Sequence, residues 1–466
     1  MQKTQTELYN YNLHRVLPAR SQWPLRWLLL GVLALALSGL PAIILVIART
    51  IAPETGAMFI NAFDVALAIH VDLSVLVWFI AILGMVWSLF LDNALAAHAP
   101  FVRGTAWWVA LLACFCMAAA AFAPVEEVHF SNYVPVIVSP TFFLGLGLFS
   151  SAVIIIAGYV LLLPLFGLKP LKGMTSPEGV LGYAVYSAAF IVVVALAVFA
   201  LTAEYLPASL QGHTYYEYLF WGGGHVLQFA YTQLLLIAWL SLLCGVTKSV
   251  RIKPVWVLAI LSVGPITAVT SFYPFIAMDV MDEWFRRFFT WQMAIAGGIA
   301  AIVFAVLMLW QLCTRGKADV TKRALWSSLI MSLLVFGAGG LFGAVIDGVN
   351  VTIPAHYHGV IVGVTLAAMG LAYQLLPRFG CLTVAHTRMA FWQPIVYGVG
   401  QLLHIGGLAI GGGYGVMRKT PGIVQEGGIW VDVAMHMIRW GGLLAVIGGL
   451  LFIIVILRSL RHKRAH

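Results

Sequence analysis

Four histidines stand inside or at the edge of long apolar stretches, where an ionisable side chain is costly to place in a membrane. His70 and His225 lie in separate stretches, and His356 and His358 open a third. At a helical rise of about 1.5 Å per residue, all four fall within roughly 12 Å of one membrane face. Imidazoles that converge at one depth of a helix bundle are typical of a metal or haem site. A second interpretation, that they only pack and hydrogen bond in a transporter, stays open here.

The spacing of His356 and His358 limits what the pair can ligate. Residues i and i+2 of a helix point about 200° apart, so these two imidazoles cannot easily share one metal. They can each ligate a different haem, one on either side of the helix. His70 can then fill the second coordination position of one haem, which leaves the other haem with an open face for a gas or a substrate.

Long apolar segments must position these histidines. The chain has 466 residues, of which 62% are hydrophobic and 9% charged, whereas ordinary soluble proteins carry about 25% charged residues. Because roughly 20 apolar residues cross a bilayer, we predict an all-α membrane protein with twelve transmembrane helices. A polar segment (1–26) and a basic tail (459–466) flank the predicted membrane domain (27–458). The predicted spans are 27–48, 63–90, 105–123, 141–166, 179–203, 218–246, 254–278, 288–314, 325–348, 354–377, 391–412 and 432–458.

Lysine and arginine predict the orientation, because cytoplasmic loops carry an excess of them. Twenty of the 26 fall on one side of the predicted topology, which places both termini in the cytoplasm and the histidines near the outer face. The net charge of +9 is therefore a topology signal and does not indicate a nucleic-acid surface. The five cysteines form no CxxC pair, so covalent haem attachment and a thiolate zinc site are not indicated. The six lysines and arginines on the opposite, outer side of the predicted topology are Arg49, Arg286, Arg287, Arg418, Lys419 and Arg439.

The order of the histidine motifs resembles subunit I of the haem–copper oxidase superfamily, which includes cytochrome oxidases and nitric oxide reductases. The matching motifs are Ala-Ile-His70-Val-Asp, Trp-Gly-Gly-Gly-His225 and His356-Tyr-His358. The resemblance implies that His70 and His358 are the axial ligands of a low-spin haem. It also implies that His356 is the proximal ligand of a high-spin haem and that His225 is the first ligand of a distal metal.

A basic pair follows the eleventh predicted span. Arg418 and Lys419 resemble the residues that bind haem propionates in this superfamily. Two cations beside carboxylates are a physically reasonable arrangement, and an ordinary solvated loop is the alternative. His404 and His436 are further candidates near the propionates, with helix packing as an equal alternative.

The sequence departs from the superfamily pattern at the distal metal. Members carry a His-His pair on the seventh span, whereas this chain has no histidine between His225 and His356. One histidine does not hold copper tightly. Asp279, Asp282 or Glu283 are candidate substitutes that would favour iron, and an acidic outer loop paired with two arginines is the simpler alternative.

The redox-active tyrosine of many oxidases is also missing from its usual place. One turn after His225 the chain has Phe229, so Tyr231 and Tyr273 are the candidate tyrosines. Gln228 is a candidate hydrogen-bond donor to a bound gas, and bundle packing is the alternative.

The resemblance implies a haem-dependent terminal oxidoreductase of the bacterial inner membrane. It would reduce O2 or NO at a five-coordinate high-spin haem, fed with electrons by a bis-histidine low-spin haem. The expected cofactors are two b-type haems, and a distal copper or iron stays open. A partner subunit with a cytochrome c or a copper centre would supply electrons. The alternatives are a dihaem electron-transfer or gas-binding subunit that has lost the distal metal, and a twelve-helix transporter.

Overall fold

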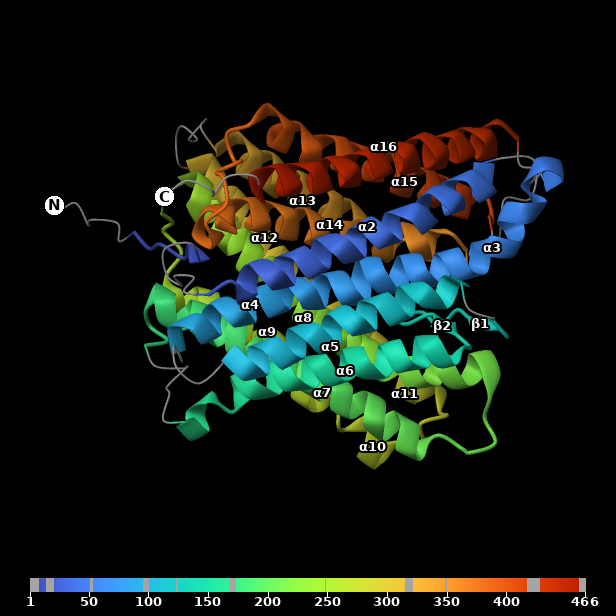
Figure 1. Cartoon of the computed structure of the whole chain (residues 1–466), viewed down its shortest axis with the longest axis horizontal. Coiled ribbons are helices and arrows are strands. Elements are labelled where there is room, and N and C mark those ends of the chain that lie inside the picture. Colours follow the sequence, from blue (N-terminus) through green and yellow to red (C-terminus); the bar gives the residue numbers. More distant parts are fainter. Residues whose placement is uncertain are drawn as a thin grey trace. The chain divides into compact units, whose positions relative to one another are not determined.

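The computed structural model describes an all-helical protein with one short antiparallel strand pair (Figure 1). It describes residues 8–13, 21–50, 53–94, 100–122, 125–166, 173–247, 249–314, 322–347, 350–416 and 428–460. Within these residues, twelve helical stretches are long and apolar enough to cross a membrane. The predicted fold class and number of spans are therefore confirmed.

Two of the described membrane spans contain a short π segment, and short 3-10 turns follow the ends of three helices. The π segments are η1 and η4, and the remaining η segments are 3-10 turns. The elements are α2 (Trp23–Thr50), α3 (Pro53–Val71), η1 (Asp72–Val77), α4 (Trp78–Ala94), α5 (Pro100–Ala119), η2 (Ala120–Phe122), β1 (Val128–His129), β2 (Val136–Ile137), α6 (Pro140–Leu161), η3 (Leu163–Phe166), α7 (Pro177–Tyr205), α8 (Gly212–Thr247), α9 (Pro254–Thr270), α10 (Pro274–Ala277), α11 (Glu283–Gln292), η4 (Met293–Gly297), α12 (Gly298–Thr314), α13 (Arg323–Ala344), α14 (Thr352–Leu375), η6 (Leu376–Phe379), α15 (Arg388–Gly413) and α16 (Gly428–Leu460).

Local sequence explains where several of these helices begin. The side chains of Ser139 and Ser176 accept hydrogen bonds from backbone N–H groups three residues on, in the first turns of α6 and α7. In both helices a proline follows the serine, at a position where its missing N–H costs nothing. Thr387 caps α15 in the same way.

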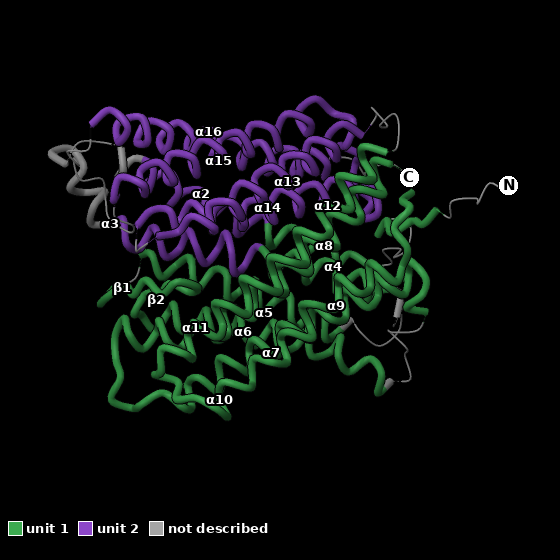
Figure 2. Tube along the Cα trace, turned by 180° about the vertical axis from the view of Figure 1, so that it is seen from behind, with its two compact units in different colours: residues 1–31, 79–319 green, residues 32–78, 320–466 purple. Residues whose placement is uncertain are grey.

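The chain divides into two compact units, coloured separately in Figure 2. Unit 1 consists of residues 1–31 and 79–319, and unit 2 of residues 32–78 and 320–466. The predicted membrane domain, residues 27–458, is thus composed of parts of both units, and its boundaries stay a prediction.

In unit 1 the central helix is α8, which is buried along most of its length and packs against α7, α9, α11 and α12. Gln233 on α8 donates to Ser187 Oγ at 2.7 Å and to the Leu261 carbonyl at 3.1 Å, and so joins α8 to α7 and α9. Hydrogen bonds of this kind stabilise helix association in a membrane, because the hydrophobic effect does not drive helices together within lipid.

The N-terminal polar segment is partly ordered against unit 1. Tyr9 forms a pair of backbone hydrogen bonds with Val250, and the hydroxyl of the fully buried Tyr11 donates to the Ile252 carbonyl at 2.8 Å. This part of the predicted cytoplasmic segment is therefore a packed element of unit 1.

In unit 2, α13 packs along α14, and α15 along α16. Tyr373 on α14 donates to Gln393 on α15 at 2.9 Å, and Gln393 donates to the Gly448 carbonyl on α16 at 3.2 Å. Glycines allow the backbones to approach: a Cβ on Gly339 would lie 2.5 Å from the backbone nitrogen of Val360. The helices that carry His356, His358 and His404 are thus closely packed.

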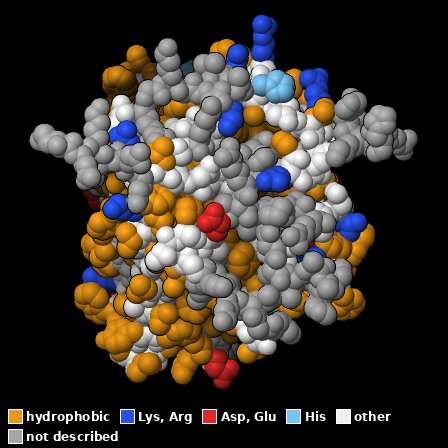
Figure 3. All heavy atoms as spheres, turned by 90° about the vertical axis from the view of Figure 1, so that its left-hand side faces the viewer, with side chains coloured by type: hydrophobic (Ala, Val, Ile, Leu, Met, Phe, Trp, Pro, Cys, Tyr) orange, Lys and Arg blue, Asp and Glu red, His pale blue; other side chains and the backbone are white. Residues whose placement is uncertain are grey.

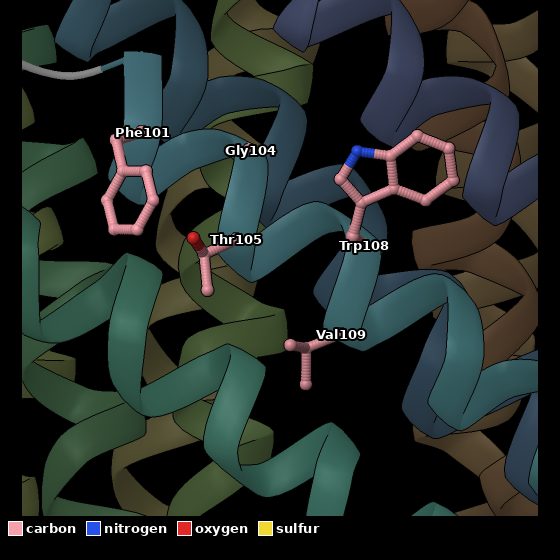
Figure 4. Close-up of a pocket in the computed structure, with 5 residues that line it drawn as sticks. All are labelled: Phe101, Gly104, Thr105, Trp108 and Val109. Atoms are coloured by element: carbon pink, nitrogen blue, oxygen red, sulfur yellow. The ribbon is translucent and has the colours of Figure 1, made fainter.

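A shallow groove on α5 is not a candidate catalytic site. It is lined by Phe101, Gly104, Thr105, Trp108 and Val109, shown in Figure 4. These positions form one face of the helix, and the side chains of Phe101 and Trp108 are 81% and 60% exposed. No lining side chain titrates, so the groove suits contact with lipid chains.

Candidate haem-binding and distal sites

His70 lies in unit 2 at the end of α3, directly before the π segment η1. Its Nδ1 is 3.0 Å from the carbonyl oxygen of Ser38. Two residues on, Asp72 is 1% exposed, and neither of its carboxylate oxygens has a hydrogen-bond partner among the described residues. π segments and unsatisfied buried polar groups are both enriched at functional sites. The surroundings of His70 therefore favour a functional role over simple packing.

His356 and His358 lie in the first two turns of α14 and are directed toward different helices. His356 Nδ1 is 2.8 Å from the carbonyl oxygen of Gly339 on α13. His358 Nδ1 is 3.0 Å from the carbonyl oxygen of Pro354, and its ring centroid is 5.5 Å from that of His404 on α15. The i, i+2 spacing thus presents the two imidazoles to opposite neighbours, as two separate haems would require.

A glycine makes room for the His356 ring. A Cβ on Gly343 would lie 2.5 Å from His356 Nδ1 and 2.8 Å from Cε1. Real Cβ atoms essentially never come that close, so the ring can occupy this position only beside a glycine.

The described hydrogen bonds assign one tautomer to the histidines of the site. A backbone carbonyl only accepts, so an imidazole Nδ1 bonded to it must carry the proton, and the lone pair is then on Nε2. This applies to His70, His356 and His358, and also to His404, whose Nδ1 is 3.1 Å from the Ile438 carbonyl. Metal-ligating histidines are typically oriented by such a bond on the other ring nitrogen. These residues therefore fit axial ligation of haem iron through Nε2.

His225 lies in unit 1 on α8 and is 5% exposed. Its Nδ1 donates to the Trp221 carbonyl at 2.7 Å, which again puts the lone pair on Nε2. Here, however, the hydroxyl of Tyr133 is 2.8 Å from Nε2 and donates to it. Burial, and then the carboxylate of Glu217, raise the pKa of Tyr133 well above its ordinary value, so the hydroxyl keeps its proton. The nitrogen that would bind a distal metal is thus already engaged.

The three glycines before His225 explain how aromatic rings surround it. A Cβ on Gly222 would lie 2.9 Å from the Phe289 ring, one on Gly223 would overlap Phe199, and one on Gly224 would overlap Tyr133. Three consecutive glycines inside a helix cost stability, and here each gives an aromatic ring direct access to the backbone. Around His225, the ring centroids of Tyr133, Trp221 and Phe289 lie at 4.7, 4.9 and 6.4 Å.

The acidic residues considered as substitute ligands have other partners. Asp279 accepts from the Met281 N–H, and Asp282 caps α11 through the Trp284 N–H. Glu283 pairs with Arg287 at 2.7 Å on an exposed surface. Over the described part of the chain, no cluster of three or more His, Cys, Asp or Glu is placed to hold a metal ion. A distal metal centre therefore does not fit the residues around His225.

The other candidate residues near His225 are less directly placed. The ring of Tyr231 packs 4.7 Å from that of Phe79, and Tyr273 is 54% exposed. Gln228 is half-buried, and its carbonyl accepts from Thr232. The tyrosine that contacts His225 is Tyr133, from the loop between β1 and β2, which was not among the predicted residues.

The predicted propionate-binding residues and the two further histidines differ in where they lie. Arg418 and Lys419 lie outside the described residues, so their assignment to haem propionates stays a prediction. His404 lies beside His358, as given above, whereas the side chain of His436 on α16 is exposed.

The fold and the histidine positions define a twelve-span membrane protein with potential haem ligands. The chain belongs to the family described as cytochrome c and quinol oxidase polypeptide I, whose sequence model matches residues 24–459. The resemblance to haem–copper oxidase subunit I is thereby confirmed.

Two relatives cover most of the chain, and both are uncharacterized proteins. One, from Rickettsia prowazekii (strain Madrid E), is 31% identical over 92% of this chain and 94% of its own length. The other, from Aquifex aeolicus (strain VF5), is 28% identical over 76% of this chain and 84% of its own. A solved haem–copper terminal oxidase dimer has a similar fold, with a TM-score of 0.66, 16% identity, and coverage of 94% of this chain and 85% of that one.

Proposed function

We propose that this chain is a dihaem redox subunit of a membrane complex, which binds O2 or NO at one of its haems. In this proposal His70 and His358 are the two axial ligands of a low-spin haem. His356 is the single protein ligand of a second, five-coordinate haem with an open face. Membership of the oxidase family supports haem binding in general, and the residue assignments are ours.

The observation that carries the proposal is the common hydrogen bonding of these histidines. In each of the three, Nδ1 donates to a backbone carbonyl between 2.8 and 3.0 Å away. This bond orients the ring and leaves the lone pair on Nε2, the nitrogen suited to iron. Three imidazoles oriented in this way fit haem ligation, and the transporter interpretation is dropped because the chain belongs to this family.

Haem supplies one-electron and gas-binding chemistry when it is bound, and the protein sets the ligation and the access. The part played by this chain's own residues is positional. Ser38, Gly339 and Pro354 provide the carbonyls that orient the imidazoles, and Gly343 provides the space for His356.

Reduction of the bound gas is a second candidate function, favoured by the family to which the chain belongs. It would have to proceed without the distal metal, because the described residues around His225 do not fit one. Electrons would come from a partner that carries a cytochrome c or a copper centre. Pure gas binding with electron transfer agrees better with the engaged Nε2 of His225.

We also propose that both termini face the cytoplasm of a bacterial cell. Twelve spans return the chain to the side on which it began, and the lysine and arginine bias supports the cytoplasm as that side. Among the described residues on the face in Figure 3, Lys and Arg side chains are more frequent than Asp and Glu. Both relatives named above come from bacteria.

The test is a set of spectra on the purified protein. We expect a pyridine haemochrome assay to give two haems per chain, and CO to shift the reduced spectrum of only one. Consumption of O2 or NO with an artificial reductant, above that of the His356→Ala variant, would support reduction of the gas. Absence of haem from protein made in haem-sufficient cells would refute the proposed function.

A further inference from the structure

The ring of His225 has both of its nitrogens engaged within unit 1. Nδ1 donates to the Trp221 carbonyl at 2.7 Å, and Nε2 accepts from the Tyr133 hydroxyl at 2.8 Å. A metal ion needs the Nε2 lone pair, so it would have to displace the tyrosine. A single imidazole offers little affinity for that exchange.

We propose that Tyr133 takes the place of the distal metal, so that His225 and Tyr133 form a permanent, metal-free hydrogen-bonded pair. The inference deepens the proposed function and rests on it for the link between this pair and haem chemistry, whereas the hydrogen bond itself does not depend on haem. It makes Tyr133 a positioning residue for His225, which the family resemblance did not indicate.

The packing of the Tyr133 ring shows that the pair is built into unit 1. The ring lies directly on the backbone of α8 at Gly224, where any side chain would overlap it. Its centroid is 4.7 Å from that of His225 and 6.1 Å from that of Trp221. Gly224, the residue before His225, therefore provides the space that the Tyr133 ring occupies.

A second contact fixes the loop that carries Tyr133. The backbone N–H of Asn132 donates to Glu217 Oε2 at 3.0 Å, and the Asn132 side-chain amide donates to Oε1. Glu217 lies on α8, two turns before His225, so one helix holds both the histidine and the anchor of its partner. On the other side, Ser131 Oγ accepts from the Val134 N–H at 3.1 Å and donates to the Val134 carbonyl at 2.6 Å.

In this superfamily the seventh span supplies further metal ligands. In this chain residues 271–292, which include the end of the seventh span, contribute aromatic side chains and hydrogen-bonded polar side chains. The ring centroid of Phe275 lies 5.2 Å from that of Phe285, and Phe285 lies 5.2 Å from Phe289. Ser271 and Gln292 hydrogen bond to each other. These contacts leave His225 with Tyr133 as its polar partner on Nε2.

The first measurement is the metal content of the full-length protein, purified without chelators and again after loading with Cu(II) or Fe(II) and desalting. We expect iron to equal the haem count and no other metal near one per chain, in the wild type and in His225→Ala alike. One copper or non-haem iron per chain that is lost in His225→Ala would overturn the proposal.

The second measurement reads the Tyr133 hydrogen bond directly by 15N NMR of histidine-labelled protein in its reduced, CO-treated form. The resonances missing from His225→Ala identify the residue, and we expect the shift of Nε2 to change in Tyr133→Phe, which keeps the ring and removes only the hydroxyl. Tyr216→Phe is the control. Tyr216 lies on α8, the helix of His225, but its ring stacks on Phe220 and His129, so its hydroxyl should not affect His225.

An Nε2 shift that is the same in Tyr133→Phe and the wild type would also overturn the proposal. The spectrum is readable whether or not haem is present. A protein without haem would therefore refute the proposed function while this test still decided the role of Tyr133.

Discussion

Replacing Gly343 by alanine tests whether His356 holds the five-coordinate haem. The new Cβ would lie 2.5 Å from Nδ1 and 2.8 Å from Cε1 of the His356 ring. The ring would have to move by most of an ångström, and the 2.8 Å bond from Nδ1 to the Gly339 carbonyl would be broken or strained. The coordinating nitrogen would then be misplaced.

The magnitude follows from overpacking, which costs about 1–3 kcal/mol in a well-packed site. If that cost falls on haem binding at His356, occupancy should drop about 5- to 150-fold, since 1.4 kcal/mol is a factor of ten. We expect Gly343→Ala to lose most of its CO-difference signal while the low-spin bands assigned to His70 and His358 remain.

The matched control is Gly340→Ala, one turn earlier on the same helix. A Cβ there meets nothing within 4 Å, and both variants gain the same helix propensity of up to about 1 kcal/mol. The main difference between the two variants is therefore the clash with the His356 ring. Equal CO-difference signals in Gly343→Ala and Gly340→Ala, normalised to protein, would refute the assignment of His356.

Two further predictions concern the low-spin haem and the stability of unit 1. His70→Ala and His358→Ala should each remove the low-spin haem spectrum and keep CO binding, because each takes away one axial ligand; unchanged low-spin bands in both variants would contradict the pairing. Asp92→Ala should lower stability by about 3–5 kcal/mol, because it leaves the buried guanidinium of Arg103 without its carboxylate. Glu283→Ala breaks a pair whose side chains are 51% and 65% exposed and should cost less than about 1 kcal/mol. Melting temperatures in detergent compare the two, and equal shifts would count against the buried pair.

The twelve spans could be predicted from the sequence because apolar length is a local property. Each predicted span overlaps a described helix, although α8 begins at Gly212 rather than near 218. Because of this extension, His225 lies thirteen residues after the start of α8. The depth of His225 in the membrane could therefore not be predicted from the apolar stretch alone. The packing of Tyr11 against the loop near Val250 was also out of reach, because it joins residues about 240 positions apart.

The histidine ligands could be proposed because intramembrane histidines are rare and the i, i+2 spacing has one geometric meaning. Their second contacts could not be, because the carbonyls of Ser38 and Gly339 belong to other helices and any residue type supplies a carbonyl. The contact of Tyr133 with His225 could not be predicted either, because Tyr133 lies in a loop whose sequence has no periodicity. The only local sign was the run of glycines before His225, which shows that something packs there without showing what.

A glycine makes room for an aromatic ring at both His356 and His225. The two sites nevertheless differ in what binds the Nε2 of the histidine, which argues for different chemistry at each. At His356 the missing side chain of Gly343 admits the imidazole itself and leaves its Nε2 lone pair for a ligand. At His225 the missing side chain of Gly224 admits a tyrosine, whose hydroxyl then binds Nε2. If His225 held a metal, a protonated phenol on its coordinating nitrogen would oppose that role. In our proposal, this member of the oxidase family therefore keeps its haem ligands and has a hydrogen bond in place of the distal metal.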